Sequence, residues 1–317
     1  MSRPVLVIGR FGQVAAALQR LASGSLPGRP LLALGRPILD LAQPDFAQRF
    51  QAVIEHHGPA LVINAAGYTD VDRAEQESDL AKVINGQAVG SMAVVCGERG
   101  IPLFHLSTDY VFDGSGTGAW SPDDPTRPLG AYGFSKLLGE IELQQSGGVF
   151  GTQALILRVS WIFAEQGRNF LCRILQLATE HPEVRVVADQ IGGPTSAESI
   201  ARALLQLVEP AIANHHPVRG AGEHFPWGIH HLQGRPSVSW CGFAQAIITD
   251  AYAIQLIRQV PAVIPITTAD FPSPARRPAN SRLDCRTARL ELGLSQPVWR
   301  QDLRDCLAAI AAAAPPS

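Results

Sequence analysis

Short apolar runs recur along the first half of the chain, and helix-like stretches separate them. The apolar runs are Val5–Ile8, Leu31–Leu34, Leu61–Asn64, Leu103–Ser107 and Leu155–Val159. The helix-like stretches between them are Gln13–Leu21, Pro44–His56, Leu80–Arg99 and Tyr132–Gln144. Runs that are apolar along their whole length, rather than alternating, are typical of parallel strands covered on both faces. The pattern therefore predicts an α/β fold with a doubly wound, Rossmann-type parallel sheet.

The second half of the chain has a looser pattern. After about residue 160, proline, glycine and tryptophan become frequent, and the segment 270–280 (DFPSPARRPAN) suits neither a helix nor a central strand. We predict that residues 1–160 form the Rossmann domain. Residues 161–317 are expected to form a smaller, irregular and mainly substrate-binding domain, some segments of which return to the sheet.

The composition argues against several classes of protein. The net charge is −2 without any block of like charges, whereas nucleic-acid binders usually show a basic face. Inspection singles out no apolar run of membrane-spanning length, and the start of the chain lacks the features of a signal peptide. The five cysteines are widely spaced without a C-x-x-C pair, which favours free thiols in a reducing cytoplasm. We expect a cytoplasmic protein that binds neither nucleic acid nor membrane.

A glycine-containing turn follows the first apolar run and opens the first predicted helix. It reads Gly9-Arg10-Phe11-Gly12, with the small residue Ala15 three positions later. The first glycine permits a tight turn, and the second lets the backbone approach a pyrophosphate. The N–H groups of the helix N-terminus would face the same phosphates. The motif predicts a dinucleotide site at Gly9 and Gly12, with an ordinary tight turn as the alternative.

The residues that follow the second run indicate which dinucleotide is bound. An NAD-dependent dehydrogenase usually has an acid after the second strand, whereas an arginine accommodates a 2′-phosphate. Here the run is followed by Arg36, and the first acid is Asp40, which we expect beside the adenine together with Leu41. Arg36 therefore favours NADPH, with NADH possible and a solvated arginine as the alternative.

Small residues follow the third run, where the sequence reads Asn64-Ala65-Ala66-Gly67. At the carboxyl end of a strand they let a flat ligand lie against the backbone, so Ala65, Ala66 and Gly67 are candidate cofactor-binding residues. Asn64 either belongs to this crevice or serves only as a turn-former.

The most specific chemical signal is a tyrosine followed four residues later by a lysine. Tyr132 and Lys136 share one face of a predicted helix. A phenol titrates near pH ~10, and a neighbouring cation lowers that pKa. We therefore expect Tyr132 to protonate a carbonyl oxygen as hydride arrives, and Lys136 to tune it and to bind the nicotinamide ribose. Thr108, at the end of an apolar run, is the candidate to hold the carbonyl.

Longer segments in the same order resemble the dTDP-4-dehydrorhamnose reductase family of extended short-chain dehydrogenases, along nearly the whole chain. They are VINAAGYTDVD at 62–72, STDYVFDG at 107–114, DDPT at 123–126, PLGAYG at 128–133, RVSW at 158–161, DQIGGPT at 189–195 and RPANS at 277–281. The resemblance implies reduction of the C4 ketone of dTDP-4-dehydro-L-rhamnose to dTDP-L-rhamnose with NADPH or NADH. It implies that Thr108, Tyr132 and Lys136 are catalytic, that Thr108, Asp109 and Trp161 contact the sugar, and that Gln13 and Val14 belong to the cofactor turn.

One departure from the family concerns a metal. Some members form a dimer around magnesium held by glutamates, one of them just after the glycine turn. Here that stretch is 15–17 (AAA), and although Glu198 matches another such position, Arg286 stands near a third where an acid would be expected. Lone carboxylates hold a hard cation poorly. We expect no bound metal, no metal-dependent dimer, and a monomer or weak homodimer.

Two other functions remain open. A related nucleotide-sugar epimerase or dehydratase would use the same tyrosine and lysine, but a dehydratase needs an acid–base pair after the threonine. Asp109-Tyr110 does not supply that pair. A non-catalytic, NADP-binding regulatory subunit would share the fold, because a fold does not by itself determine function. Intact Thr108, Tyr132 and Lys136 argue against this alternative.

Overall fold

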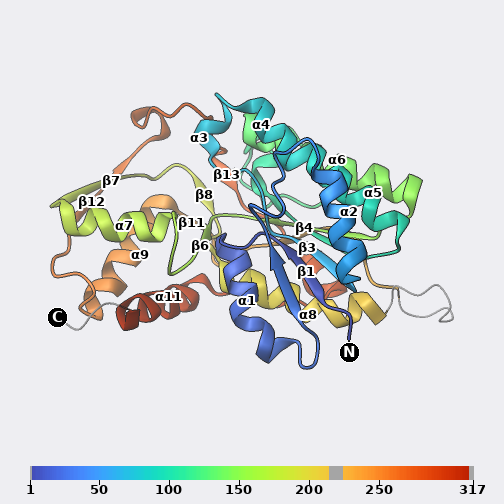
Figure 1. The fold of residues 1–317 in the computed structure, drawn as a ribbon. Helices are drawn as coiled ribbons and strands as arrows, with labels where there is room; N and C mark the ends of the chain where they lie inside the picture. The colour runs from blue at the N-terminus through green and yellow to red at the C-terminus, as the bar shows by residue number, and fades with distance from the viewer. Residues whose placement is uncertain (1, 214–223, 314–317) are drawn as a thin grey trace.

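The central layer of the protein is a six-stranded sheet, seen in a computed structural model that describes residues 2–213 and 224–313 (Figure 1). Every pairing in this sheet is parallel, and the strand order is β10-β5-β4-β3-β1-β2. The strands are β1 (Val5–Ile8), β2 (Leu31–Leu34), β3 (Leu61–Asn64), β4 (Leu103–Thr108), β5 (Ala154–Val159) and β10 (Gly228–Leu232). The predicted α/β class and parallel sheet are confirmed, and β4 and β5 each extend one residue beyond the predicted run.

Helices cover both faces of this sheet (Figure 1). One face packs against α1 (Gln13–Ser25) and α8 (Ala197–Ala213), and the other against α2 (Phe46–His57) and α5 (Ala88–Glu98). In β1, Val5 and Val7 point to the first core and Leu6 and Ile8 to the second, and all four side chains are fully buried. Burial on both faces is the reason that the strand is apolar at every position.

The predicted helices have different bounds in the structure: Gln13–Leu21 is α1, which runs to Ser25, and Pro44–His56 is α2, which begins at Phe46 and ends at His57. The predicted helix Tyr132–Gln144 is α6 (Ala131–Phe150), which continues to Gly151, a left-handed residue (φ 69°) that ends it. The predicted helix Leu80–Arg99 is three pieces: α4 (Ser78–Lys82), a π-helical turn (Val83–Gln87) and α5, preceded by the short α3 (Val71–Ala74).

The π-helical turn packs closely against α6. Asn85 lies in the turn, buried, and its side chain bonds both the N–H (2.8 Å) and the carbonyl (3.0 Å) of Tyr68 and the hydroxyl of Ser135 (2.9 Å). A Cβ on Gly139 of α6 would lie 2.2 Å from the Asn85 carbonyl oxygen, so only glycine fits there. Periodicity alone does not reveal this contact.

In the described part of the chain, one helical run, Ser78–Glu98, is long and apolar enough to cross a membrane by length and composition. The sequence inspection did not single it out. Within the fold 56% of its most apolar window is buried, and α5 packs against α2 and α6. The run is therefore weak evidence for a membrane span.

A third core lies beside the sheet, on the left of Figure 1. It is built by α7 (Phe170–Glu180), β7 (Glu183–Val187), α9 (Trp240–Ala253), β12 (Ala262–Ile266) and α11 (Trp299–Ala313). Shorter elements complete this half: β6 (Ile162–Phe163), β8 (Ile191–Gly192), β9 (Thr195–Ser196), β11 (Val238–Ser239), β13 (Asn280–Ser281) and α10 (Arg286–Glu291). The structure places β10 and α8 of this half with the central sheet, and the division at residue 160 stays a prediction.

A buried ion pair fixes α6 against the carboxyl ends of β4 and β5. The Arg158 guanidinium donates to both carboxylate oxygens of Glu140, from Nη2 at 2.7 Å and from Nε at 3.0 Å. The Ser107 hydroxyl donates to the same carboxylate at 2.5 Å. Arg158 and Glu140 are 2% and 1% exposed, so solvent does not screen the pair. The pair therefore holds in place the sheet edge from which Thr108 projects.

Candidate active site

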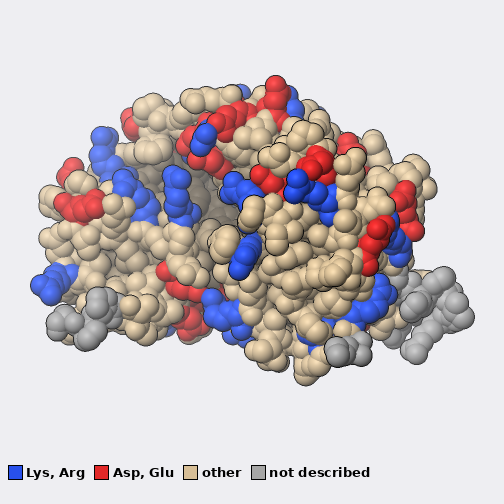
Figure 2. Space-filling model, in the orientation of Figure 1, with Lys and Arg blue, Asp and Glu red and all other residues tan. Residues whose placement is uncertain are grey.

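A cavity of about 770 Å³ opens at the carboxyl ends of the parallel strands. Figure 2 shows the hollow on this face, with side chains of both charges near its rim. All of the predicted cofactor-binding residues line it: Gly9, Gly12, Gln13, Val14, Arg36, Asp40, Leu41, Ala65, Ala66, Gly67, Tyr132 and Lys136. The predicted substrate residues Thr108, Asp109 and Trp161 are not among the lining residues. The topology thus brings the cofactor set together from four separate segments.

The glycine turn forms one wall of this cavity. Gly9 has a φ of +114°, and a Cβ there would lie 3.2 Å from the carbonyl carbon of Ala65. Gly12 is the N-cap of α1, whose first turn has neither a side-chain cap nor an acidic residue. The free N–H groups of this helix end and the absence of a nearby acid suit an anionic ligand. The Oε1 atom of Gln13 is also buried, and it has no hydrogen-bond partner within the described part of the chain.

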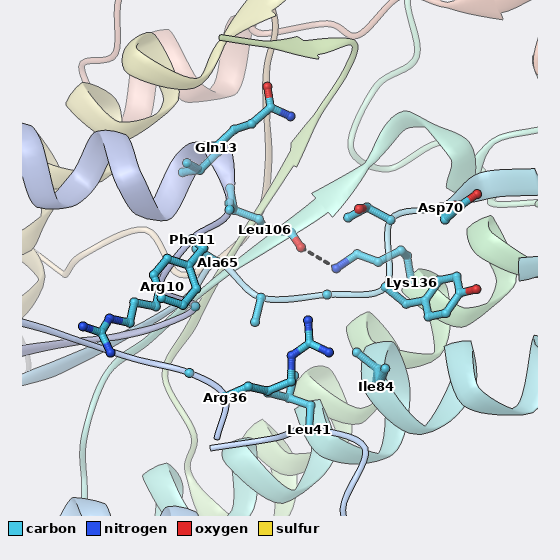
Figure 3. Close-up of a pocket in the computed structure, with 18 of the residues that line it drawn as sticks. Arg10, Phe11, Gln13, Arg36, Leu41, Ala65, Asp70, Ile84, Leu106 and Lys136 are labelled. Carbon is cyan, nitrogen blue, oxygen red and sulfur yellow. Dashed lines mark hydrogen bonds between the residues drawn. The ribbon is translucent and has the colours of Figure 1, made fainter. Parts of the chain in front are cut away.

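Arg36 follows β2 and reaches the same cavity. Figure 3 shows its guanidinium extending past Leu41 toward the segment that carries Ala65. No ion pair joins Arg36 to an acid within the described residues. Its charge is therefore available to a ligand.

Lys136 lies at the inner end of the cavity, where it is only 6% exposed. Its Nζ donates to the carbonyl oxygen of Leu106 at 2.6 Å, as the dashed line in Figure 3 marks, and lies 3.2 Å from Nε2 of His105. Burial lowers the pKa of Lys136 to about 8, and the Glu140 carboxylate opposes this shift. The ammonium is thus directed at β4, one turn of α6 away from Tyr132.

Tyr132 lines the cavity with its ring edge-on to Tyr110, at 5.5 Å between centroids. Burial raises the pKa of Tyr132 to about 12, against the lowering effect of its hydrogen bond with Thr108, and Asp109 raises it further. That Lys136 lowers the pKa of Tyr132 stays a prediction. Desolvation of the phenolate has the largest effect on the pKa of Tyr132, and the lysine nitrogen donates to Leu106.

Thr108 and Asp109 form a buried polar pair behind Tyr132. The Thr108 hydroxyl donates to Oδ1 of Asp109 at 3.1 Å and accepts from the N–H of Tyr110 at 3.2 Å. Burial raises the pKa of Asp109 to about 6, and its Oδ2 has no hydrogen-bond partner among the described residues. The pair therefore offers an unused acceptor next to the predicted proton donor.

Trp161 lies outside the cavity lining. It is 8% exposed, has a left-handed backbone (φ 49°), and stacks on Trp240 with 3.6 Å between ring centroids. Gly192 also lies against Trp161, where a Cβ would approach the indole to 2.5 Å. Trp240 is the half-buried member of the pair, and the sequence analysis did not single it out. Contact of Trp161 with a sugar stays a prediction.

The residues considered for magnesium are paired with arginines. Glu198 binds Arg20 at 2.8 Å and Arg202 at 2.5 Å, and Asp284 binds Arg286 at 2.6 Å. Within residues 2–213 and 224–313, no group of three or more His, Cys, Asp or Glu side chains could hold a metal ion. The arginines neutralise the carboxylates that a cation would need, and the expected absence of a metal stays a prediction.

The sequence analysis missed a role for His105 and left Asn64 between two alternatives. The structure buries Asn64, with its Oδ1 accepting from the N–H of Ala66 at 3.1 Å and its Nδ2 3.0 Å from Nδ1 of His105. His105 in turn contacts Lys136. Strand pairing aligns Asn64 with His105, and no local sequence signal reports that alignment.

A glycine turn at the first strand and a Tyr–Lys helix that share one cavity of a doubly wound parallel sheet define a nicotinamide-dependent oxidoreductase of the short-chain type. The family model described as RmlD substrate binding domain matches residues 2–312. The chain is 40% identical over 305 residues to the dTDP-4-dehydrorhamnose reductase of Burkholderia thailandensis, covering 96% of this chain and 97% of that protein. With the enzyme of that name from Escherichia coli K12 it shares 33% identity, covering 96% of each.

Solved structures similar to this chain include members of the same family. A dTDP-4-dehydrorhamnose reductase from Bacillus anthracis in complex with NADP superimposes with a TM-score of 0.83 at 29% identity, covering 98% of this chain and 100% of that one. A dTDP-4-dehydrorhamnose reductase from Clostridium acetobutylicum gives 0.84 at 27% identity, covering 97% and 99%. The chain belongs to the dTDP-4-dehydrorhamnose reductase family, and the resemblance read from its motifs is confirmed.

Proposed function

We propose that this protein reduces the C4 ketone of dTDP-4-dehydro-L-rhamnose to dTDP-L-rhamnose with NADPH. The observation that carries the proposal is the single cavity in which the glycine turn meets Tyr132 and Lys136. The relative from Burkholderia thailandensis, which is named dTDP-4-dehydrorhamnose reductase and matches 96% of this chain, supports the substrate. The NADP complex of the Bacillus anthracis relative supports the cofactor.

The cavity fits a dinucleotide at each predicted point. The uncapped start of α1 suits a pyrophosphate, the small residues Ala65, Ala66 and Gly67 suit a flat group, and Arg36 suits a 2′-phosphate. Asp40 and Leu41 would flank the adenine end, and Lys136 would bind the nicotinamide ribose. When bound, NADPH supplies the hydride that adds to the C4 carbon.

Tyr132 is the proton donor in this reaction. With a pKa of about 12 it holds its proton at neutral pH, and it can pass that proton to the C4 oxygen as this becomes an alkoxide. Thr108 and Asp109 lie beside Tyr132 and would orient the ketone, Oδ2 of Asp109 accepting from a sugar hydroxyl. The hydride adds to carbon and the proton to oxygen, which gives the alcohol.

The deciding experiment follows NADPH oxidation with dTDP-4-dehydro-L-rhamnose generated in situ. We expect turnover, and a loss of roughly 10²–10⁴ in rate for Tyr132→Phe with NADPH affinity retained. Tyr252→Phe, a half-exposed tyrosine of α9, is the matched control and should keep the rate. Tight NADPH binding without turnover would instead favour the regulatory alternative, and a C4 or C5 epimer as the product, identified by NMR, would favour the epimerase.

We also propose that the protein works in the cytoplasm as a monomer or weak homodimer without metal. Its five cysteines are all free, and four of them are buried, which suits a reducing compartment. Gel filtration followed by metal analysis tests the assembly. Stoichiometric magnesium retained by a stable dimer would contradict the proposal.

A further inference from the structure

A chain of buried hydrogen bonds lies behind the cavity and ends at Lys136. It begins at the N–H of Ala66, which donates to Oδ1 of Asn64 at 3.1 Å. Nδ2 of Asn64 lies 3.0 Å from Nδ1 of His105, and Nε2 of His105 lies 3.2 Å from Nζ of Lys136. Asn64 and His105 are each 1% exposed, so bulk solvent does not compete for these bonds.

The direction of this chain is fixed at its first member. A backbone N–H can only donate, so the carbonyl oxygen of the Asn64 side chain must face Ala66 and its NH₂ must face His105. That NH₂ can only donate, so Nδ1 of His105 accepts and carries no proton. Burial and the nearby Lys136 hold the pKa of His105 well below its usual value, so the imidazole is neutral and its proton is on Nε2.

The Nε2–H of His105 therefore points at Nζ of Lys136. A neutral amine accepts this bond with its lone pair while it donates to the carbonyl of Leu106. An ammonium has no lone pair and would meet the Nε2–H proton to proton. The chain of bonds thus favours the neutral form of Lys136.

The other ionisable groups around Lys136 do not remove this effect. On its own helix, Glu140 favours the ammonium, but that carboxylate is already bound by Arg158 of β5. Tyr132, one turn before Lys136, is protonated. The Asp109 carboxyl lies next to Tyr132 and acts on that residue. Among these groups, His105 is the one whose hydrogen-bonding direction bears on the Lys136 nitrogen itself.

We propose that His105, oriented by Asn64, is a positioning residue that sets the protonation state of Lys136. The His105 tautomer is independent of what the protein catalyses, whereas its consequence for activity rests on the proposed function. In the reductase, Lys136 exchanges its proton close to neutral pH, and activity declines on the alkaline side as the ammonium is lost.

The first test is NMR of the full chain labelled with ¹⁵N-histidine. The His105 signals are identified by their absence in His105→Gln. We expect a proton on Nε2 and a bare Nδ1 across the neutral range. A proton on Nδ1, or an imidazolium, would overturn the proposal, and this reading requires neither turnover nor a bound ligand.

The second test compares the alkaline midpoint of NADPH-dependent reduction among variants. In Asn64→Asp the carboxylate accepts from both Ala66 and Nδ1–H of His105, which moves the bare nitrogen to Nε2. Nε2 can then accept from the ammonium of Lys136, so the midpoint should rise by about 1 pH unit or more. In a His105→Leu background the same substitution adds only a remote charge and should shift the midpoint less.

The variant His105→Gln is the conservative control. The glutamine side-chain oxygen can accept from Asn64 while its NH₂ donates to Lys136. The alkaline midpoint of this variant should therefore equal that of the unsubstituted protein. Equal shifts for Asn64→Asp in the presence and absence of His105 would refute the proposal. Absence of turnover in the unsubstituted protein would refute the proposed function instead, and the NMR result would still decide the tautomer.

Discussion

Breaking the buried ion pair between α6 and β5 should be among the most costly single substitutions in this protein. Glu140→Gln keeps the shape of the side chain but leaves the Arg158 guanidinium, 2% exposed, without its carboxylate. The remaining contacts of Arg158 are the carbonyl of Pro122 at 3.3 Å, Nε2 of His231 at 3.4 Å and the ring of Phe112, 5.0 Å from the guanidinium carbon. None of these groups neutralises its charge. Removing one partner of a buried pair costs about 3–5 kcal/mol, a large part of the ~5–15 kcal/mol that stabilises a typical domain.

Urea denaturation followed by circular dichroism measures this loss as the change in the free energy of unfolding. The control is Asp45→Asn, which breaks the exposed pair with Arg49 (2.7 Å; side chains 43% and 51% exposed) and should cost about 0.5 kcal/mol or less. Replacing both partners, as in Glu140→Leu with Arg158→Met, should recover most of the loss because no buried charge remains. A Glu140→Gln cost no larger than that of Asp45→Asn would refute the reasoning.

Three further outcomes follow from the cavity and its surroundings. Arg36→Ala should weaken NADPH binding about 10- to 100-fold and NADH binding little, since only NADPH carries the 2′-phosphate; fluorescence titration of both nucleotides checks this. Asp109 has a pKa of about 6 in the folded protein, against an ordinary value of 3.8, so the folded state binds the proton more tightly. The free energy of unfolding should therefore fall by about 2–3 kcal/mol as the pH rises from 3.8 through about 6. Asp109→Asn should remove this slope in a pH series of urea denaturations. Gly9→Ala, at φ +114°, should cost about 1–3 kcal/mol of stability, whereas Gly12→Ala, at φ −69°, should keep stability and lose NADPH affinity, which thermal melts with and without NADPH separate.

The sheet could be predicted from the sequence because its strands are buried on both faces. Val5–Ile8 is apolar throughout, and Leu61–Asn64 is polar only at its last residue, so neither resembles a helix pattern. The structure has those bounds. The sixth strand could not be predicted in this way. Gly228–Leu232 contains His230 and His231, both buried, and pairs with β5 only after the chain has passed through α7 and α8. Such long-range pairing leaves no local signal.

The cofactor end of the site could be predicted because its motifs are local. The glycine turn, Arg36 and the small residues after β3 each follow a strand, and the parallel topology alone brings them to one cavity. The substrate end is different, since Trp161 is positioned by Trp240 and Gly192, both distant in the sequence. The Thr108 hydroxyl donates to Asp109, and the adjacency of these two residues in the sequence does not by itself predict that bond.

The helical spacing of Tyr132 and Lys136 predicts that the lysine charge lowers the pKa of the phenol. In the structure, burial has the largest effect on the pKa of both groups. Burial disfavours the charged form of both groups, and it therefore raises the pKa of an acid and lowers that of a base. The phenol moves from 10.0 to about 12 and the ammonium from 10.5 to about 8, so Lys136 loses its proton well before Tyr132 does. Tyr132 is consequently suited to donate a proton to a developing alkoxide. The group whose pKa lies closer to neutral is Lys136. If its neighbours Glu140 and His105 govern its protonation as proposed, we expect them to set how activity responds to pH.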